Sequence, residues 1–308
     1  MTTLSAKTRY ILMAAWSILA ASSCTNDNEP ETSPTIAFQP TVQTRAVKES
    51  FTTNDAFTVW GGYDNDATNV FNGETVTNNG GNNWSYTGTR YWVSGKTYNF
   101  YAIYPTGYGT CSQTGTLTIH KFDTSTNKGD QAIDLMTAEA LGRSGSNPAP
   151  VPFTFRHELA RVQVVAQCDP GVSASDIQTT FSGFRTKGTL IRNATTTSWN
   201  DLDGVGSFTG NIASLSSNSE ESLYGDMLLI PQDINNEVQL SVSLKRGNTP
   251  LSGTFSLSDA SQSWEAGQTY RYTIRIEVDA ITFSNFTVDK WGETNAGGDI
   301  NIEQSDNQ

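Results

Sequence analysis

The chain has 308 residues, of which 31 are acidic and 19 basic, so its formal net charge is −12. Charged residues make up 16% of the sequence, against roughly 25% in an average soluble domain. This composition excludes a nucleic-acid-binding protein, which needs clustered lysine and arginine, and a helical bundle, which would be rich in Ala, Glu, Lys and Leu. With 3 cysteines and 2 histidines, a polythiol metal cluster and a disulfide-rich mini-protein are excluded as well.

The chain begins with the pattern of a lipoprotein signal peptide. Lys7 and Arg9 precede an apolar run from Tyr10 to Ala21, which is too short to span ~30 Å of hydrocarbon as a helix but fits the hydrophobic region of a secretory signal. Small residues then lead to Cys24, as in a bacterial lipobox, although alanine replaces the usual leucine three residues before the cysteine. We predict that residues 1–23 are a signal peptide and that Cys24 carries the lipid. An ordinary signal peptide cut within a few residues of the same place is the alternative.

Residues 24–50 are predicted to form a tether followed by a strand. The segment directly after the cysteine is acidic, polar and proline-containing, which is typical of a flexible linker. Further along, Ile36, Phe38, Pro40 and Val42 alternate with polar residues, as in a strand with one buried face.

Period-two alternation continues through the rest of the chain and predicts an all-β fold. The clearest stretch is Tyr270–Val278, and turns rich in glycine and asparagine separate such runs. Half-buried strands with frequent turns favour antiparallel β-sandwiches. The pattern Trp92-x-x-Gly95-x-Thr97-Tyr98 recurs from Trp264 onward, which suggests two tandem domains. The proline-containing segment 143–150 has the composition of a linker, so we place an N-terminal sandwich at 51–148 and a C-terminal sandwich at 149–308.

No motif for catalysis or metal binding is found, so no enzymatic activity, cofactor or metal is predicted. Nucleophile elbows and H-E-x-x-H are absent, and His120 and His157 stand alone in strand-like contexts. The acidic loops 64–66 and 201–203 contain oxygen donors suited to calcium but lack the spacing of an EF-hand, which favours solvated loops. Whether Cys111 and Cys168 form a disulfide stays open at this point.

The role of the tryptophans can be interpreted in two ways. The mature chain contains six of these residues: Trp60, Trp84, Trp92, Trp199, Trp264 and Trp291. Packing over a sandwich core is the favoured interpretation. If Trp84 and Trp199 were instead exposed together on one face, a platform for sugar rings would gain support.

Several segments, taken in order, carry a resemblance to a known family. They are Thr44-Arg45-Ala46, Phe51-x-x-x-Asp55-x-Phe57-x-Val59-Trp60, Tyr91-Trp92-x-x-Gly95-x-x-Tyr98-x-Phe100-Tyr101-Ala102-x-Tyr104-Pro105, Asp134-Leu135-Met136-x-Ala138, Phe153-x-Phe155-x-His157-x-Leu159-Ala160-Arg161-Val162, Leu229-Ile230-Pro231-Gln232 and Trp264-x-x-Gly267-x-x-Tyr270-x-Tyr272-x-Ile274. The ordered set resembles the fimbrillin family of Bacteroidetes surface lipoproteins, the Mfa-like and FimA-like subunits of type V pili.

The resemblance implies two tandem transthyretin-like β-sandwich domains, anchoring by lipid in the outer membrane, and assembly with other subunits by donor-strand exchange. It implies that an arginine-specific protease cuts between Arg45 and Ala46 and removes the strand of Ile36, Phe38 and Val42. A strand of the next subunit then fills the groove, and the tail with Ile300 and Ile302 is the expected donor. That tail region, from Ile281 on, reads equally well as the last strands of the C-terminal sandwich. A host or bacterial surface ligand is a further implied partner.

The alternative function is a glycan-binding outer-membrane lipoprotein that does not polymerise, because such a protein would share the anchor, tether, sandwiches and tryptophans.

Overall fold

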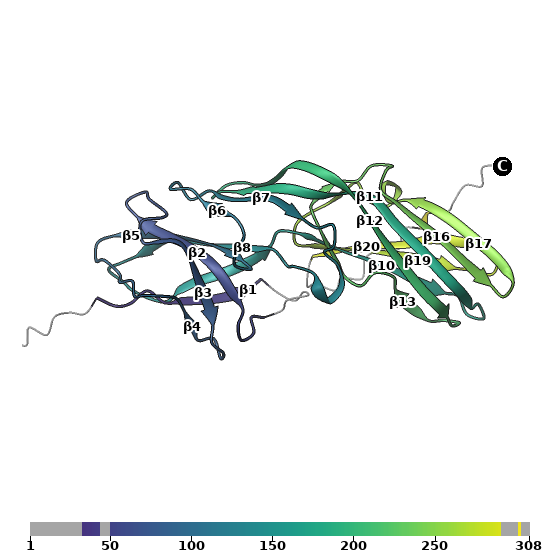
Figure 1. The fold of residues 1–308 in the computed structure, drawn as a ribbon, viewed down its shortest axis with the longest axis horizontal. Coiled ribbons are helices and arrows are strands. Elements are labelled where there is room, and N and C mark those ends of the chain that lie inside the picture. The colour runs from purple at the N-terminus through teal and green to yellow at the C-terminus, as the bar shows by residue number, and fades with distance from the viewer. Residues whose placement is uncertain (1–32, 44–49, 291–300, 303–308) are drawn as a thin grey trace, which may run out of the picture. The chain divides into compact units, whose positions relative to one another are not determined.

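The computed structural model describes residues 33–43, 50–290 and 301–302, and Figure 1 shows their strands. Within these residues there are β-strands, two 3-10 helices (η1, Gly129–Gln131, and η2, Leu257–Asp259) and no α-helix. The all-β prediction is confirmed, whereas the division into two tandem domains remains a prediction.

The first sheet has seven strands. In spatial order they are β1 (Phe38–Val42), β9 (Val151–His157), β8 (Met136–Ser144), β5 (Thr97–Tyr104), β2 (Ala56–Tyr63), β3 (Phe71–Asn78) and β4 (Trp84–Ser85). The pair β1–β9 is parallel, and the other pairs of this sheet are antiparallel.

Two further sheets of six strands follow. One contains β13 (Glu220–Ser222), β10 (Ala160–Cys168), β19 (Gln268–Ile276), β20 (Ile281–Lys290) and β21 (Asn301–Ile302) in this order, with β14 (Met227–Leu229) also paired to β10. The other contains β17 (Thr249–Ser256), β16 (Gln239–Arg246), β11 (Ala174–Arg192), β7 (Leu117–Asp123) and β6 (Thr110–Cys111), with β12 (Thr197–Leu215) paired to β11. A small pair joins β15 (Gln232–Asp233) to β18 (Ser263–Trp264).

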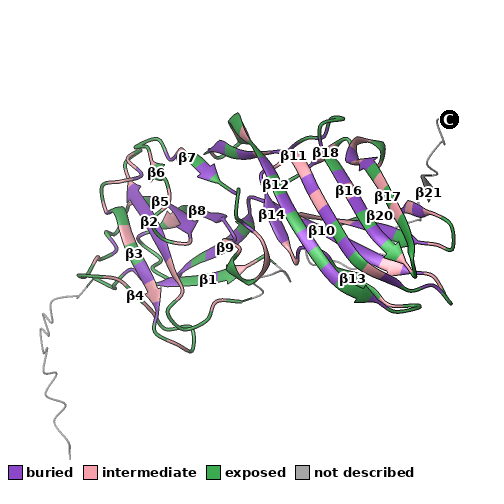
Figure 2. Cartoon of the chain, turned by 45° about the vertical axis from the view of Figure 1, so that its right-hand side comes forward, coloured by how far each residue is buried: buried purple, intermediate pink, exposed green. Residues whose placement is uncertain are grey.

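Side-chain alternation explains why these segments form strands. In β10, Val162 and Val164 are buried, while Gln163 between them and Arg161 before them are half-buried, and Figure 2 shows buried and exposed positions alternating along the strands. Such strands bury one face against a second layer. Three apolar clusters result: one under the first sheet, one formed by residues of the second and third sheets, and one that contains residues of the first and third sheets, such as Tyr101 and Leu190.

The repeated Trp-Gly-Tyr pattern forms the same backbone corner twice. The hydroxyl of Tyr98 accepts a hydrogen bond from the backbone N–H of Val93 at 2.9 Å, and that of Tyr270 accepts one from Glu265 at 2.8 Å. The glycine of each copy has a positive φ, 79° at Gly95 and 69° at position 267, a conformation that residues with a Cβ rarely adopt. The sequence echo is therefore an echo of local structure.

The predicted boundary at 148/149 does not separate the sheets. β9 begins at Val151 and belongs to the first sheet, while β7, from the predicted N-terminal sandwich, pairs with β11 of the third. The segment 145–150 connects β8 to its antiparallel neighbour β9, and its Gly145 N–H donates to Lys96 O at 2.8 Å. Glycine and proline favour a connection between adjacent strands as readily as a linker between domains, so the composition of this segment does not by itself mark a domain boundary.

The two described cysteines do not pair. Cys111 lies in β6 and Cys168 in β10, and both are free thiols. Burial raises the pKa of both, that of Cys111 to about 12. Because the thiolate is the reactive form, a Cys24→Ser variant of the mature chain should react slowly with Ellman's reagent at pH 8 until it is unfolded. A fast reaction of the folded protein, or a lower Tm after reduction, would contradict this assignment.

Candidate functional site: the edge strand β1

β1 lies at the edge of the first sheet and contributes side chains to its core. Ile36, Phe38 and Pro40 are buried and Val42 is half-buried, while the residues between them are exposed. The alternation expected for this segment is thus present. Two short backbone ladders hold the strand in place.

The first ladder is antiparallel and the second parallel. Before β1, the Ile36 N–H donates to Arg90 O at 2.9 Å and the Trp92 N–H donates to Pro34 O at 3.0 Å. Along β1, Val151 N–H donates to Ala37 O at 2.7 Å and Gln43 N–H to Phe155 O at 2.8 Å, in the register that pairs Phe38 with Val151.

This register sets the direction of every backbone group of β1. Ala37 and Gln43 direct their peptide groups toward β9, and the direction alternates along a strand, so the groups of Phe38, Pro40 and Val42 are directed to the outer edge. Pro40 lacks an N–H, and its place at the outer edge means that no bond to β9 is lost. A proline there also hinders a further strand from pairing with this edge.

Phe38 is the centre of the contact between β1 and the core. Its ring is stacked on Phe153 with centroids 5.7 Å apart and an interplanar angle of 7°. Four further rings meet it edge-on at centroid distances between 5.3 and 6.1 Å: Phe57, Phe71, Tyr86 and Phe100. The Tyr86 hydroxyl also donates to Ile36 O at 2.7 Å, and burial raises its pKa.

β9 depends on β1 for much of its pairing. β8 pairs with β9 only at Met136–His157 and Thr137–Arg156, whereas β1 pairs with all residues from Val151 to Phe155. Without β1, this part of β9 would lose its ladder and the ring of Phe153 would be uncovered. The space that β1 occupies is therefore a groove suited to one strand with apolar side chains at alternate positions.

The other predicted assembly residues are distributed as follows. Cys24, Arg45, Ala46 and Ile300 lie outside the described residues. Ile302 belongs to β21, where it pairs with Phe283 of β20. β20 itself pairs with β19 from Ile281 to Lys290.

The described tryptophans do not form an exposed platform. Trp60, Trp92 and Trp264 are buried, Trp84 packs against Phe51 and Phe57, and the indole of Trp199 donates to the Glu158 carbonyl at 2.9 Å. Trp291 lies outside the described residues. The described tryptophans therefore give no support to a glycan-binding platform.

A buried polar network next to β9 was not predicted. Nη1 of Arg192 donates to Glu158 Oε1 at 2.6 Å and to Thr137 Oγ1 at 2.7 Å, and the Thr137 hydroxyl donates to Glu158. Burial raises the pKa of Glu158, while the adjacent guanidinium favours its charged form. The network joins the end of β11 to β8 and to the residue after β9.

A second buried pair adjoins this network. His157 Nδ1 lies 2.9 Å from Asp134 Oδ1, and both side chains are almost fully buried. His157 is therefore a packed residue of the core. Among the described residues, no group of three or more acidic, histidine or cysteine residues is placed to hold a metal ion.

Comparison with known proteins identifies the family. The model of the fimbrillin-like family matches residues 44–291. The chain belongs to the fimbrillin-like family. Membership indicates a fimbrial or adhesin subunit at the cell surface or in a fimbria, and a structural role rather than an enzymatic one.

Solved structures of similar fold support the architecture. A protein of Bacteroides ovatus assigned to cell adhesion has a TM-score of 0.60 and 16% identity, over 85% of this chain and 99% of that one. Another such protein, from Bacteroides uniformis, has a TM-score of 0.54 and 18% identity, over 83% of this chain and 98% of that one. No curated protein matches the chain. In the described part, no helix has the length and apolar character needed to cross a membrane.

Proposed function

We propose that this fimbrillin-like chain is a structural subunit or adhesin of a type V fimbria that assembles by donor-strand exchange. In this proposal the subunit is exported as an outer-membrane lipoprotein on Cys24, and proteolysis between Arg45 and Ala46 separates β1 from the rest of the chain. A strand of a second subunit then replaces β1 beside β9.

The observation that carries the proposal is the pairing of β1. It is an edge strand, so it can leave without breaking the order of the other strands, yet its removal uncovers five residues of β9 and the ring of Phe153. An incoming strand would regain main-chain hydrogen bonds with β9, and its alternate side chains would occupy the positions of Ile36, Phe38 and Val42. This is recognition by β-augmentation, and each buried apolar side chain contributes roughly 1.5–3 kcal/mol.

Limited proteolysis of the purified chain 24–308 tests the cut and its consequence. An arginine-specific protease should remove residues 24–45, as mass spectrometry of the product would show, and SDS-resistant ladders should follow. An Arg45→Lys variant is the matched control and should give neither result. A chain cut at this bond that stays monomeric, also when residues 24–45 are absent from the start, would refute strand exchange.

The donor is tested separately within the tail. Ile302→Asp should reduce ladder formation at least tenfold, because a carboxylate would have to enter an apolar position of the groove, whereas Asn301→Asp, on the opposite face of a strand, should have little effect. Equal ladders from both variants would show that another strand is the donor.

A further inference from the structure

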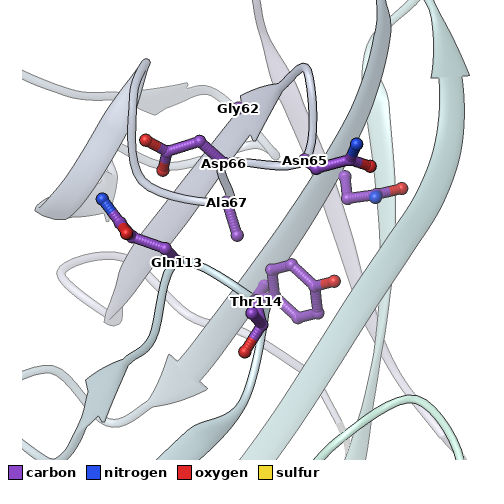
Figure 3. Close-up of a pocket in the computed structure, with 8 residues that line it drawn as sticks. Gly62, Asn65, Asp66, Ala67, Gln113 and Thr114 are labelled. Carbon is purple, nitrogen blue, oxygen red and sulfur yellow. The ribbon is translucent and has the colours of Figure 1, made fainter.

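A small polar cavity of about 250 Å³ opens beside β2 and β5 of the first sheet. It is lined mainly by side chains with hydrogen-bonding groups, and Figure 3 shows those on the loop after β2 together with those on the loop after β6. The lining residues with hydrogen-bonding side chains are Asn65, Asp66, Asn99, Tyr101, Gln113 and Thr114.

The cavity lies on the face of the sheet opposite to the side chains of β1. Phe100 of β5 contacts Phe38, and successive side chains of a strand point to opposite faces. Asn99 and Tyr101, the neighbours of Phe100, therefore point away from the strand β1. A ligand in the cavity would not compete with the exchange of that strand.

The two loops around the cavity are held in one conformation. Asp66 Oδ1 accepts hydrogen bonds from the N–H and the hydroxyl of Thr68 at 2.8 and 2.7 Å, and the Ala67 N–H donates to Gln113 O at 2.8 Å. Gly62 has no room for a Cβ, which would lie 2.1 Å from Asp66 O. A site that is already ordered loses little entropy when it binds a ligand.

Several polar groups of this ordered site remain available. The carboxamides of Asn65 and Gln113 make no hydrogen bond to the described part of the chain. Asn99 uses only its Oδ1, which accepts from the Gly142 N–H at 2.9 Å, so its amide protons are available. Asp66 likewise accepts hydrogen bonds at Oδ1, and its Oδ2 is available.

We propose that this cavity binds one sugar ring of a neutral glycan. Carboxamides offer donors and acceptors side by side and the carboxylate accepts, which matches adjacent sugar hydroxyls. Tyr101 lines the cavity but is only 6% exposed, so recognition rests mainly on the polar groups. No lysine or arginine lines the cavity, so the single carboxylate disfavours anionic sugars. The volume lies below the range of roughly 300–1,000 Å³ for drug-sized ligands, and it therefore suits a single ring.

NMR titration of the isotope-labelled mature chain tests the proposal. The probes are the methyl glycosides of glucose, galactose, mannose and fucose, with methyl sialoside as the anionic comparison. At least one neutral glycoside should shift the amide signals of residues around 62–67 and 113–114 saturably, with a Kd of about 1 mM or below. The sialoside should not do so.

Two substitutions localise the binding. Gln113→Ala and Asn65→Ala each remove a carboxamide without breaking a described hydrogen bond, and each should weaken binding about three- to tenfold. Asn211→Ala, which removes an exposed carboxamide from β12, is the matched control and should bind as the unchanged protein.

Three results would overturn the proposal. They are the absence of saturable shifts with every neutral glycoside, preference for the sialoside, and binding that Gln113→Ala and Asn65→Ala leave unchanged.

Discussion

Replacing Phe38 with alanine is expected to lower the free energy of unfolding by about 3–5 kcal/mol, the usual cost of removing a buried aromatic side chain. The ring is only 5% exposed, and other aromatic rings surround it. Phe153 and Phe57, which contact it, are fully buried, and the centroids of their two rings are 5.7 Å apart. These rings have little freedom to close the space left by the substitution, so the cost should fall in the upper part of the range for cavity formation.

Guanidinium unfolding of the uncut chain measures this effect. Gln39→Ala, in the same strand but exposed, is the matched control and should change the free energy of unfolding by less than about 0.5 kcal/mol. A loss below about 1 kcal/mol for Phe38→Ala would mean that β1 contributes little to the core, and the groove inferred beneath it would not exist as an apolar site.

The same substitution separates stability from assembly. If β1 is the strand that is exchanged, Phe38→Ala weakens only the segment that leaves, because residue 38 is absent from the processed subunit. Ladder formation after cleavage should then become faster, while the final polymer should be as stable as that of the unchanged protein. A less stable polymer would show that residue 38 remains in the assembled subunit.

The sequence predicts the strands well because local alternation reports which face of a strand is buried. Ile36 and Phe38 were placed on the inner face of β1 by this pattern, and Tyr270 and Tyr272 in β19 likewise, and all four are buried. Alternation carries no information on which strand lies next to which. The parallel pairing of β1 with β9, more than a hundred residues along the chain, therefore could not be derived from it.

The polar sites were inaccessible to sequence reasoning for the same physical reason. Glu158 and Arg192 meet because β11 ends beside the residue that follows β9, and neither residue belongs to a motif. Asn65 and Gln113 come together because the loop between β2 and β3 contacts the loop between β6 and β7, where the Ala67 N–H donates to Gln113 O. Such constellations depend on non-local pairing, whereas the tryptophan corners at 92 and 264 were recognisable because the tyrosine hydroxyl that closes each corner bonds a residue five positions away.

Breaking the buried ion pair of Arg192 and Glu158 is the second change with a large expected effect. Glu158→Leu leaves the Arg192 guanidinium buried beside only the more distant Glu139, whose carboxylate is 3.5 Å away, and Arg192→Met leaves the Glu158 carboxylate without its cation. Each single change should lower the free energy of unfolding by about 3–5 kcal/mol, because an uncompensated charge stays in an apolar environment. The side chains are 6% and 3% exposed, so water cannot replace the lost partner.

The double variant Arg192→Met with Glu158→Leu decides the cause. If desolvated charge is responsible, the double variant should lose much less than the sum of the single changes, since a buried pair replaced by apolar groups of similar volume is often neutral. Arg156, whose side chain is 46% exposed and pairs with Glu139, is the control, and Arg156→Met should cost at most about 1 kcal/mol. Additive losses in the double variant would instead assign the cost to packing, and Arg192 would then hold β11 to β8 through its stem and its bond to Thr137 rather than through its charge.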